Sequence, residues 1–174
     1  VMSVLTAHAR SGRTLFLSIH QLGDAARICD RLVLLSDGRV AGEGTLDGQA
    51  DETHWWPWKT SKGAEGQVPA RNRLIAMIEA GTPVAERVFA EGSYLRPQFI
   101  QPYRCRNVLI EGVTIVNSPM WEINPVLCTN VTVRGVTVRS HGPNNDGCDP
   151  ESCRDVLIER CTFDTGDDCI ALKS

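Results

Sequence analysis

The chain has 174 residues, 42% of them hydrophobic, and a formal net charge of -3. This length is enough for one domain with a core of its own, and the slightly acidic balance gives no electrostatic reason to bind nucleic acid or an anionic membrane. No apolar run reaches the length of a membrane span, and residues 1–13 lack the basic and then apolar layout of a signal peptide. The cellular location stays open.

The first quarter of the chain predicts a small α/β unit. Apolar runs at residues 14–19 and 31–35 have the length of buried strands, and residues 22–29 carry apolar side chains at helical spacing. A turn then leads into a short strand at residues 39–41.

Three strings in this part are similar to the C-terminal end of the ATPase subunit of ABC transporters: LSIH (17–20), AARICDRLVLL (25–35) and DGRVAGEGT (37–45). In that family the residue matching His20 contacts the γ-phosphate. The phosphate loop G-x-x-x-x-G-K-[ST] has no counterpart in this sequence, so nothing would cradle a triphosphate. We therefore expect residues 1–44 to be a fragment of such a subunit, His20 to meet no nucleotide, and the chain not to bind ATP.

The next stretch is rich in aromatic residues. Three of the four tryptophans lie within residues 55–58, where they could stack on a sugar ring or anchor a loop. Residues 74–79 predict a short amphipathic helix that ends before Gly81, and residues 87–89 could form a strand.

A repeat that begins at Cys105 predicts the fold. CRNVLIEGVTI (105–115) recurs as CTNVTVRGVTV (128–138) and as CRDVLIERCTF (153–163), so the steps from Cys105 to Cys128 and from Cys128 to Cys153 are 23 and 25 residues. Each copy holds two short runs of alternating β-type residues around a bend. A fixed period of this size with strand content is typical of a solenoid, here a right-handed parallel β-helix of about three coils.

Stacking of the three copies would place equivalent side chains in ladders. Two inward ladders, a ladder at a turn and a ladder of cysteines are expected. Their members are Val108, Val131 and Val156; Ile110, Val133 and Ile158; Asn107, Asn130 and Asp155; and Cys105, Cys128 and Cys153. The chain has seven cysteines, an odd number without a C-x-x-C pair, so we expect free thiols and not disulfides.

Three carboxylates lie in two turns that follow successive copies. Asp146 precedes Asp167 by 21 residues, close to one coil, and Asp168 is its neighbour. Coils lie roughly 4.8 Å apart, so the three acids should share one rim and raise the pKa of one of them. Paired acids are what cleavage of a glycosidic bond needs. The alternatives are that Asp and Gly merely suit turns, or that the acids bind a cation such as Ca²⁺.

The same turns carry a family resemblance. NNDG (144–147) and GDDCIALKS (166–174) resemble the first two active-site motifs of glycoside hydrolase family 28, the polygalacturonases. Three further segments are similar to that family: NSPMW (117–121), RP (96–97) and WWPW (55–58). The resemblance covers residues 44–174. It implies a β-helix that hydrolyses α-1,4-galacturonosyl bonds of pectin with inversion, without a cofactor or a metal.

By position, the resemblance makes Asp167 the general acid, while Asp146 and Asp168 hold and deprotonate the water; His141 flanks the site without an assigned role. The family's later Gly-His-Gly and Arg-x-Lys motifs, which supply a histidine and cationic contacts to galacturonate, have no counterpart in residues 1–174. We therefore expect little or no activity from this chain, and an exposed apolar end that makes it marginally stable or prone to aggregate.

Three interpretations remain open at this point. The first is a polygalacturonase-like β-helix at residues 45–174 behind an unrelated ATPase fragment at residues 1–44, with a join expected within residues 42–48, where both families can carry a Gly-x-Gly-Thr-Leu string. The second is a non-catalytic β-helix that binds acidic polysaccharide or serves structurally. The third is an ABC-type nucleotide-binding subunit, which only the first part of the chain supports.

Overall fold

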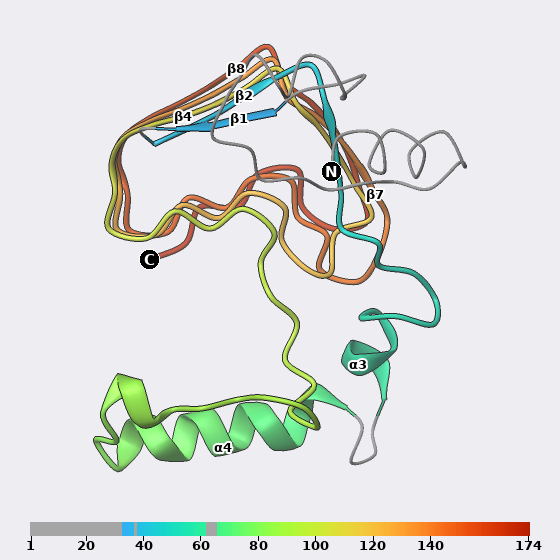
Figure 1. Cartoon of the computed structure of the whole chain (residues 1–174), viewed down its shortest axis with the longest axis vertical. Coiled ribbons are helices and arrows are strands. Elements are labelled where there is room, and N and C mark those ends of the chain that lie inside the picture. The colour runs from blue at the N-terminus through green and yellow to red at the C-terminus, as the bar shows by residue number, and fades with distance from the viewer. Residues whose placement is uncertain (1–32, 37, 62–65) are drawn as a thin grey trace, which may run out of the picture.

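The computed structural model describes residues 33–36, 38–61 and 66–174. These residues build a stack of parallel coils, and a helical excursion leaves the stack between its first and second coils (Figure 1). The elements expected at residues 14–19 and 22–29, and His20 with them, lie outside the described residues.

Two sheets form two sides of each coil. The first sheet contains, in spatial order, β1 (Val33–Ser36), β2 (Arg39–Gly42), β4 (Arg106–Glu111), β6 (Thr129–Arg134) and β8 (Arg154–Glu159). The second contains β3 (Thr45–Asp47), β5 (Thr114–Val116), β7 (Thr137–Ser140) and β9 (Thr162–Thr165). Apart from the antiparallel β1–β2 hairpin, neighbouring strands are parallel. The predicted right-handed parallel β-helix is thus confirmed.

The inward ladders form as the repeat predicts. Val131 pairs with Val108 on one side and Val156 on the other, and Val133 pairs in the same way with Ile110 and Ile158. In the middle coil Val131 and Val133 are completely buried. Because side chains alternate along a strand, these residues fill the interior while their neighbours face solvent.

A third side closes each coil without forming regular strands. Single parallel bridges link Ile100 to Ile123 and then run through Cys148 to Ile170. A second line of bridges runs from Tyr103 through Val126 and Glu151 to Lys173. This third side begins directly after the turns that carry the predicted acids, so it fixes their height along the stack.

The two polar ladders also form. Asn107 and Asn130 both have a φ of 59°, Asp155 has 58°, and the Asn130 Nδ2 group donates a hydrogen bond of 2.8 Å to Asn107 Oδ1. Asn and Asp tolerate this left-handed conformation better than other residues with a Cβ. The backbone N–H groups of Cys105 and Cys128 donate to the sulfur one coil further on, and the six described cysteines are free thiols, as predicted.

The described structure adds a fourth, N-terminal layer to the three predicted coils. Strand β2 pairs with β4, and β3 pairs with β5, in the same parallel register as later coils. The boundary predicted at residue 44 therefore falls between two strands of one layer. The assignment of residues 1–44 to an ATPase fragment stays a prediction.

The excursion contains α3 (Pro57–Thr60), α4 (Gln67–Glu79) and η1 (Val84–Glu86), and it lies to one side of the β-helix (Figure 1). The predicted helix is confirmed and begins earlier, at Gln67, but none of its residues is buried among the described ones. The strand expected at residues 87–89 is wrong, because no described strand lies beside this segment to pair with it. Within the described ranges, no helix combines the length and apolar character needed to cross a membrane.

The tryptophan cluster anchors the excursion. Trp56 Nε1 donates to the Ser118 carbonyl at 2.9 Å, and the Trp58 ring packs against Trp55 at 4.7 Å and Tyr94 at 5.2 Å between centroids. These contacts support the anchoring interpretation of residues 55–58. Trp55, Trp58 and Tyr94 also line a cavity of about 420 Å³, and sugar stacking there stays a prediction.

In the described part of the chain, no strand covers the outer edges of β8 and β9. Val156 and Ile158 are accordingly only half-buried, in contrast to their equivalents in the middle coil. Leu172 is 84% exposed, and Leu157 is exposed on the outer face of β8.

Candidate active site

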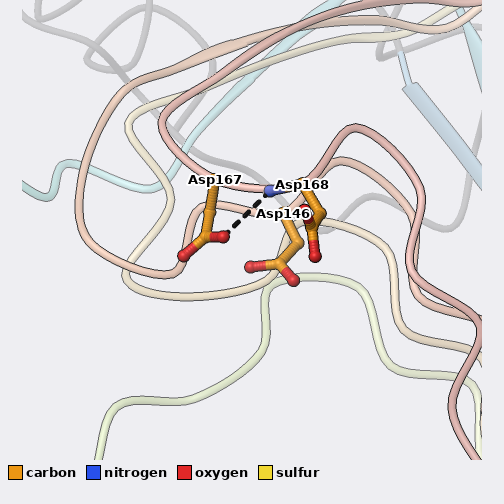
Figure 2. Close-up of side chains that lie close together, drawn as sticks. All are labelled: Asp146, Asp167 and Asp168. Atoms are coloured by element: carbon orange, nitrogen blue, oxygen red, sulfur yellow. Dashed lines mark hydrogen bonds between the residues drawn. The ribbon is translucent and has the colours of Figure 1, made fainter.

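The three predicted acids lie at the same corner of two successive coils. Asp146 follows β7, Asp167 and Asp168 follow β9, and the Gly147 N–H donates to the Asp168 carbonyl at 2.9 Å. One oxygen of each carboxylate lies within 4.8 Å of the others. Figure 2 shows the three side chains pointing to a common side of the two turns. The structure therefore brings all three together.

A buried amide holds the turn that carries Asp146. Asn145 Oδ1 accepts hydrogen bonds from Ser140 Oγ at 2.7 Å and from the Gly142 N–H at 2.8 Å. Its Nδ2 group donates to the carbonyls of Ser118 and Met120 in the preceding coil at 3.0 and 3.1 Å. The amide thus satisfies four partners at once, which fixes the turn against the coil below it.

A buried arginine outside the repeat braces the same turn. The Arg96 guanidinium donates to the carbonyls of Pro119 and Pro143 at 2.9 and 2.6 Å and to Asn144 Oδ1 at 2.8 Å. Burial lowers the pKa of Arg96 to about 10. Sequence reasoning singled out Arg96 only as part of a family-like segment and missed this role, although Arg96 is the one basic residue between residues 88 and 103.

Gly147 lets the two turns approach each other. A Cβ at this position would lie 2.5 Å from the Phe163 ring and 2.6 Å from the Cys169 carbonyl oxygen. Those atoms belong to the next coil and to the turn that holds the other two acids. The glycine in the NNDG string is therefore a packing requirement of the site.

The second turn is ordered by local hydrogen bonds. The Asp168 N–H donates to Asp167 Oδ1 at 3.0 Å, the dashed line in Figure 2, and Thr165 Oγ1 donates to the Asp167 carbonyl at 2.9 Å. Asp167 and Asp168 are exposed, whereas Asp146 is buried. A polysaccharide that approaches from solvent would meet Asp167 and Asp168 first.

The surroundings of Asp146 shift the pKa of its carboxyl group. Burial raises the pKa of Asp146; the Lys173 ammonium opposes this rise, and the Asp167 carboxylate adds to it. A carboxyl whose pKa is raised by its surroundings is what acid–base chemistry at a glycosidic bond uses.

Two further buried acids lie beside Asp146, and sequence reasoning missed both. Burial raises the pKa of Asp149 to about 7 and that of Glu122 to about 8, and in each case the Asp146 charge contributes. The Glu122 N–H donates to the Asp146 carbonyl at 2.9 Å, so Glu122 lies one coil below. The third side has no strand alternation that could have marked these residues as inward-facing; the closeness of Asp149 to the NNDG string was the available signal.

Lys173 supplies the positive charge. Its Nζ atom lies 3.5 Å from Asp146 Oδ2 and 3.3 Å from Asp149 Oδ2. His141, which was expected to flank the site, lies beside Gly166 of the second turn, and its ring pairs with Asp164 at 2.7 Å; both side chains are exposed. The acidic cluster could also hold a divalent cation, so the expectation of no metal and no cofactor stays a prediction.

The fold and the cluster together define a parallel β-helix that carries three carboxylates at one corner. Residues 89–174 match the family model described as glycosyl hydrolases family 28. A probable polygalacturonase of Vitis vinifera is 39% identical over 83 residues, which are 47% of this chain and 17% of that protein.

Solved structures agree with this match. The hyperthermoactive exopolygalacturonase from Thermotoga maritima is 56% identical with a TM-score of 0.73, over 78% of this chain and 32% of that one. The family 28 exopolygalacturonase of Yersinia enterocolitica, 21% identical with a TM-score of 0.52 over 77% of this chain and 26% of that one, supports the fold alone.

These matches support glycoside hydrolase family 28, the polygalacturonases, as the family of the matched part of the chain. The chain spans about a third or less of the length of the relatives it matches. None of the matches bears on the ABC-transporter resemblance of residues 1–44.

Proposed function

We propose that the protein is a glycoside hydrolase that cleaves α-1,4-galacturonosyl bonds of pectin or polygalacturonate. The observation that carries the proposal is the convergence of Asp146, Asp167 and Asp168 on one rim of the β-helix, within 4.8 Å of one another. Acids in such an arrangement can protonate a leaving oxygen and activate a water molecule.

Asp167 is the general acid in this mechanism. Its carboxylate is exposed, and only Oδ1 accepts the Asp168 N–H, so Oδ2 remains able to carry a proton to the glycosidic oxygen. The proton must leave from a group that the polysaccharide can touch, and the exposed turn meets that requirement.

Asp146 and Asp168 hold the water molecule in this mechanism and remove its proton. They belong to successive coils at the same corner, so a water molecule between them can hydrogen-bond to both carboxylates. Attack by that water on the face opposite the leaving oxygen gives inversion. The assignment of inversion rests on the family resemblance.

Asp167→Asn tests the catalytic assignment. We expect reducing-end release from polygalacturonate to fall by at least about a hundredfold, because the amide cannot donate the proton, while binding of an oligogalacturonate persists. Fluorescent end-labelling over long incubations measures the release. NMR of the first product should show the β-anomer, the outcome of inversion at an α-linkage.

Asp164→Asn is the matched control, since Asp164 is an exposed aspartate three residues earlier that pairs with His141. Equal release by the Asp167 variant and the parent would contradict the proposal. Binding without any release by the parent would favour the second candidate function, a non-catalytic β-helix that binds acidic polysaccharide.

A further inference from the structure

Lys173 makes three contacts that converge on the acidic cluster. Its ammonium lies 3.5 Å from Asp146 Oδ2, 3.3 Å from Asp149 Oδ2 and 4.3 Å from the centroid of the Trp121 ring. The lysine belongs to the third side of the last coil, where it bridges to Glu151. Contacts to two carboxylates and one aromatic face restrict the ammonium far more than a single surface ion pair would.

The charges around Asp146 explain why a cation is needed there. The ionisable groups that face it come from three successive coils: Glu122 from the coil below, Asp149 from its own coil, and Asp167, Asp168 and Lys173 from the coil above. Within the described residues, Lys173 is the only basic side chain that forms an ion pair with any of these acids. Without it, Asp146 would face carboxyl groups alone.

The two oxygens of Asp146 have different surroundings. Oδ2 faces the Lys173 ammonium, whereas Oδ1 is buried and has no hydrogen-bond partner within the described residues. The ion pair at Oδ2 holds the carboxylate in one orientation, and a fixed orientation is what a water-activating base requires.

We propose that Lys173, clamped between Asp149 and the Trp121 ring, is a positioning residue that holds the Asp146 carboxylate in the orientation from which it takes the proton of the attacking water. The proposal rests on the proposed function and adds two residues, Lys173 and Asp149, to its machinery. The opposing effects of burial and of the lysine on the pKa of Asp146 agree with this arrangement.

The test replaces Lys173 with Met, which keeps the length of the side chain and removes its charge. The pKa of Asp146, followed by carboxyl ¹³C NMR on the ¹³C-aspartate-labelled chain, should rise by about one pH unit, because an opposite charge at this distance is lost. Where turnover is measurable, the acidic limb of its pH profile should move by the same amount. At a fixed pH below neutrality kcat should fall about tenfold with KM changed less than twofold. Lys173→Arg should restore most of the original pKa of Asp146 and most of kcat.

Arg134→Met is the matched control, because Arg134 forms ion pairs with Glu111 and Glu159 on the first sheet and not at this corner. The control should leave the titration of Asp146 unchanged. If Lys173→Met does not fold, the double variant Lys173→Met/Asp149→Asn removes the pair together and should still raise the pKa of Asp146. An unchanged titration of Asp146 in the folded lysine variant would overturn the proposal. The NMR measurement needs no turnover, so failure of the proposed function would appear separately, as absent hydrolysis with an intact shift.

Discussion

At the scale of single residues, the acidic corner combines exposed groups with completely buried ones. Glu122 is 0% exposed, and burial raises its pKa from an ordinary value of 4.5 to about 8, so it is largely protonated at neutral pH. The unfolded chain, in contrast, ionises this residue near pH 4.5. A group of this kind links the stability of the coil stack directly to pH.

Glu122→Gln should therefore reduce the pH dependence of stability. Because the folded-state pKa is raised, the stabilisation is fully present below about pH 4.5 and is lost as the pH rises through about 8. Between pH 5 and pH 8 we expect the parent to lose on the order of 4 kcal/mol more than the variant, at about 1.4 kcal/mol for each pH unit. Thermal unfolding at a series of pH values measures the difference.

Glu79→Gln, at the exposed end of α4, is the control and should follow the parent curve. Identical slopes for Glu122→Gln and the parent would show that Glu122 ionises normally in the folded protein. Asp149 contributes in the same direction, with a window that closes near pH 7, so the variant should retain part of the slope.

At the scale of elements, equivalent turns of neighbouring coils contact one another, and these contacts add to the alternation of side chains along each strand. Asn130 combines a left-handed backbone conformation with a side-chain hydrogen bond to Asn107 in the coil below. The left-handed conformation recurs in register at Asn107 and Asp155, and at Asn130 a single residue serves both the backbone and the stack.

Two substitutions at Asn130 should separate these contributions. Asn130→Gly keeps access to the left-handed conformation and loses the hydrogen bond, at a cost of about 1 kcal/mol. Asn130→Ala loses both and should cost about 2 kcal/mol. Urea unfolding of the two variants measures the free energies, and equal losses would show that the conformation at this position costs nothing.

The elements also show what the sequence could predict. The period from Cys105 to Cys153 was sufficient for the sheets, the ladders and the shared corner, because parallel stacking follows from a repeat alone. The third side could not be predicted, since its bridges involve single residues and carry no alternation that marks Glu122 or Asp149 as buried. The strand expected at residues 87–89 failed because β-type composition forms a strand only where a partner edge is present.

At the scale of the whole molecule, the described chain leaves the outer edges of β8 and β9 unpaired by other described strands. The same end exposes Leu157 and Leu172. Open strand edges with apolar side chains are templates for pairing with another copy. The sequence-based expectation of marginal stability or aggregation stays a prediction.

Leu157→Lys should reduce self-association, because a charge on the outer face of β8 opposes edge-to-edge pairing without entering the core. Light scattering coupled to size-exclusion chromatography should show the parent shifting to larger species with rising concentration, and the variant doing so at a concentration roughly tenfold higher, if about 1.4 kcal/mol of contact is removed. Leu109→Lys, at the equivalent position of an inner coil, is the control and should not change the profile.

Alkylation of the free thiols can report how the coil stack opens. Of the six described cysteines only Cys169 is exposed, and burial raises the pKa of the Cys148 thiol, which keeps it protonated and unreactive while the coils are closed. A thiol-alkylating reagent therefore marks the turn beside Asp168 in the intact protein. As the coils separate, it reaches the remaining sulfurs in the order in which their layers come apart, so the sequence of modification reads out where along the stack unfolding begins.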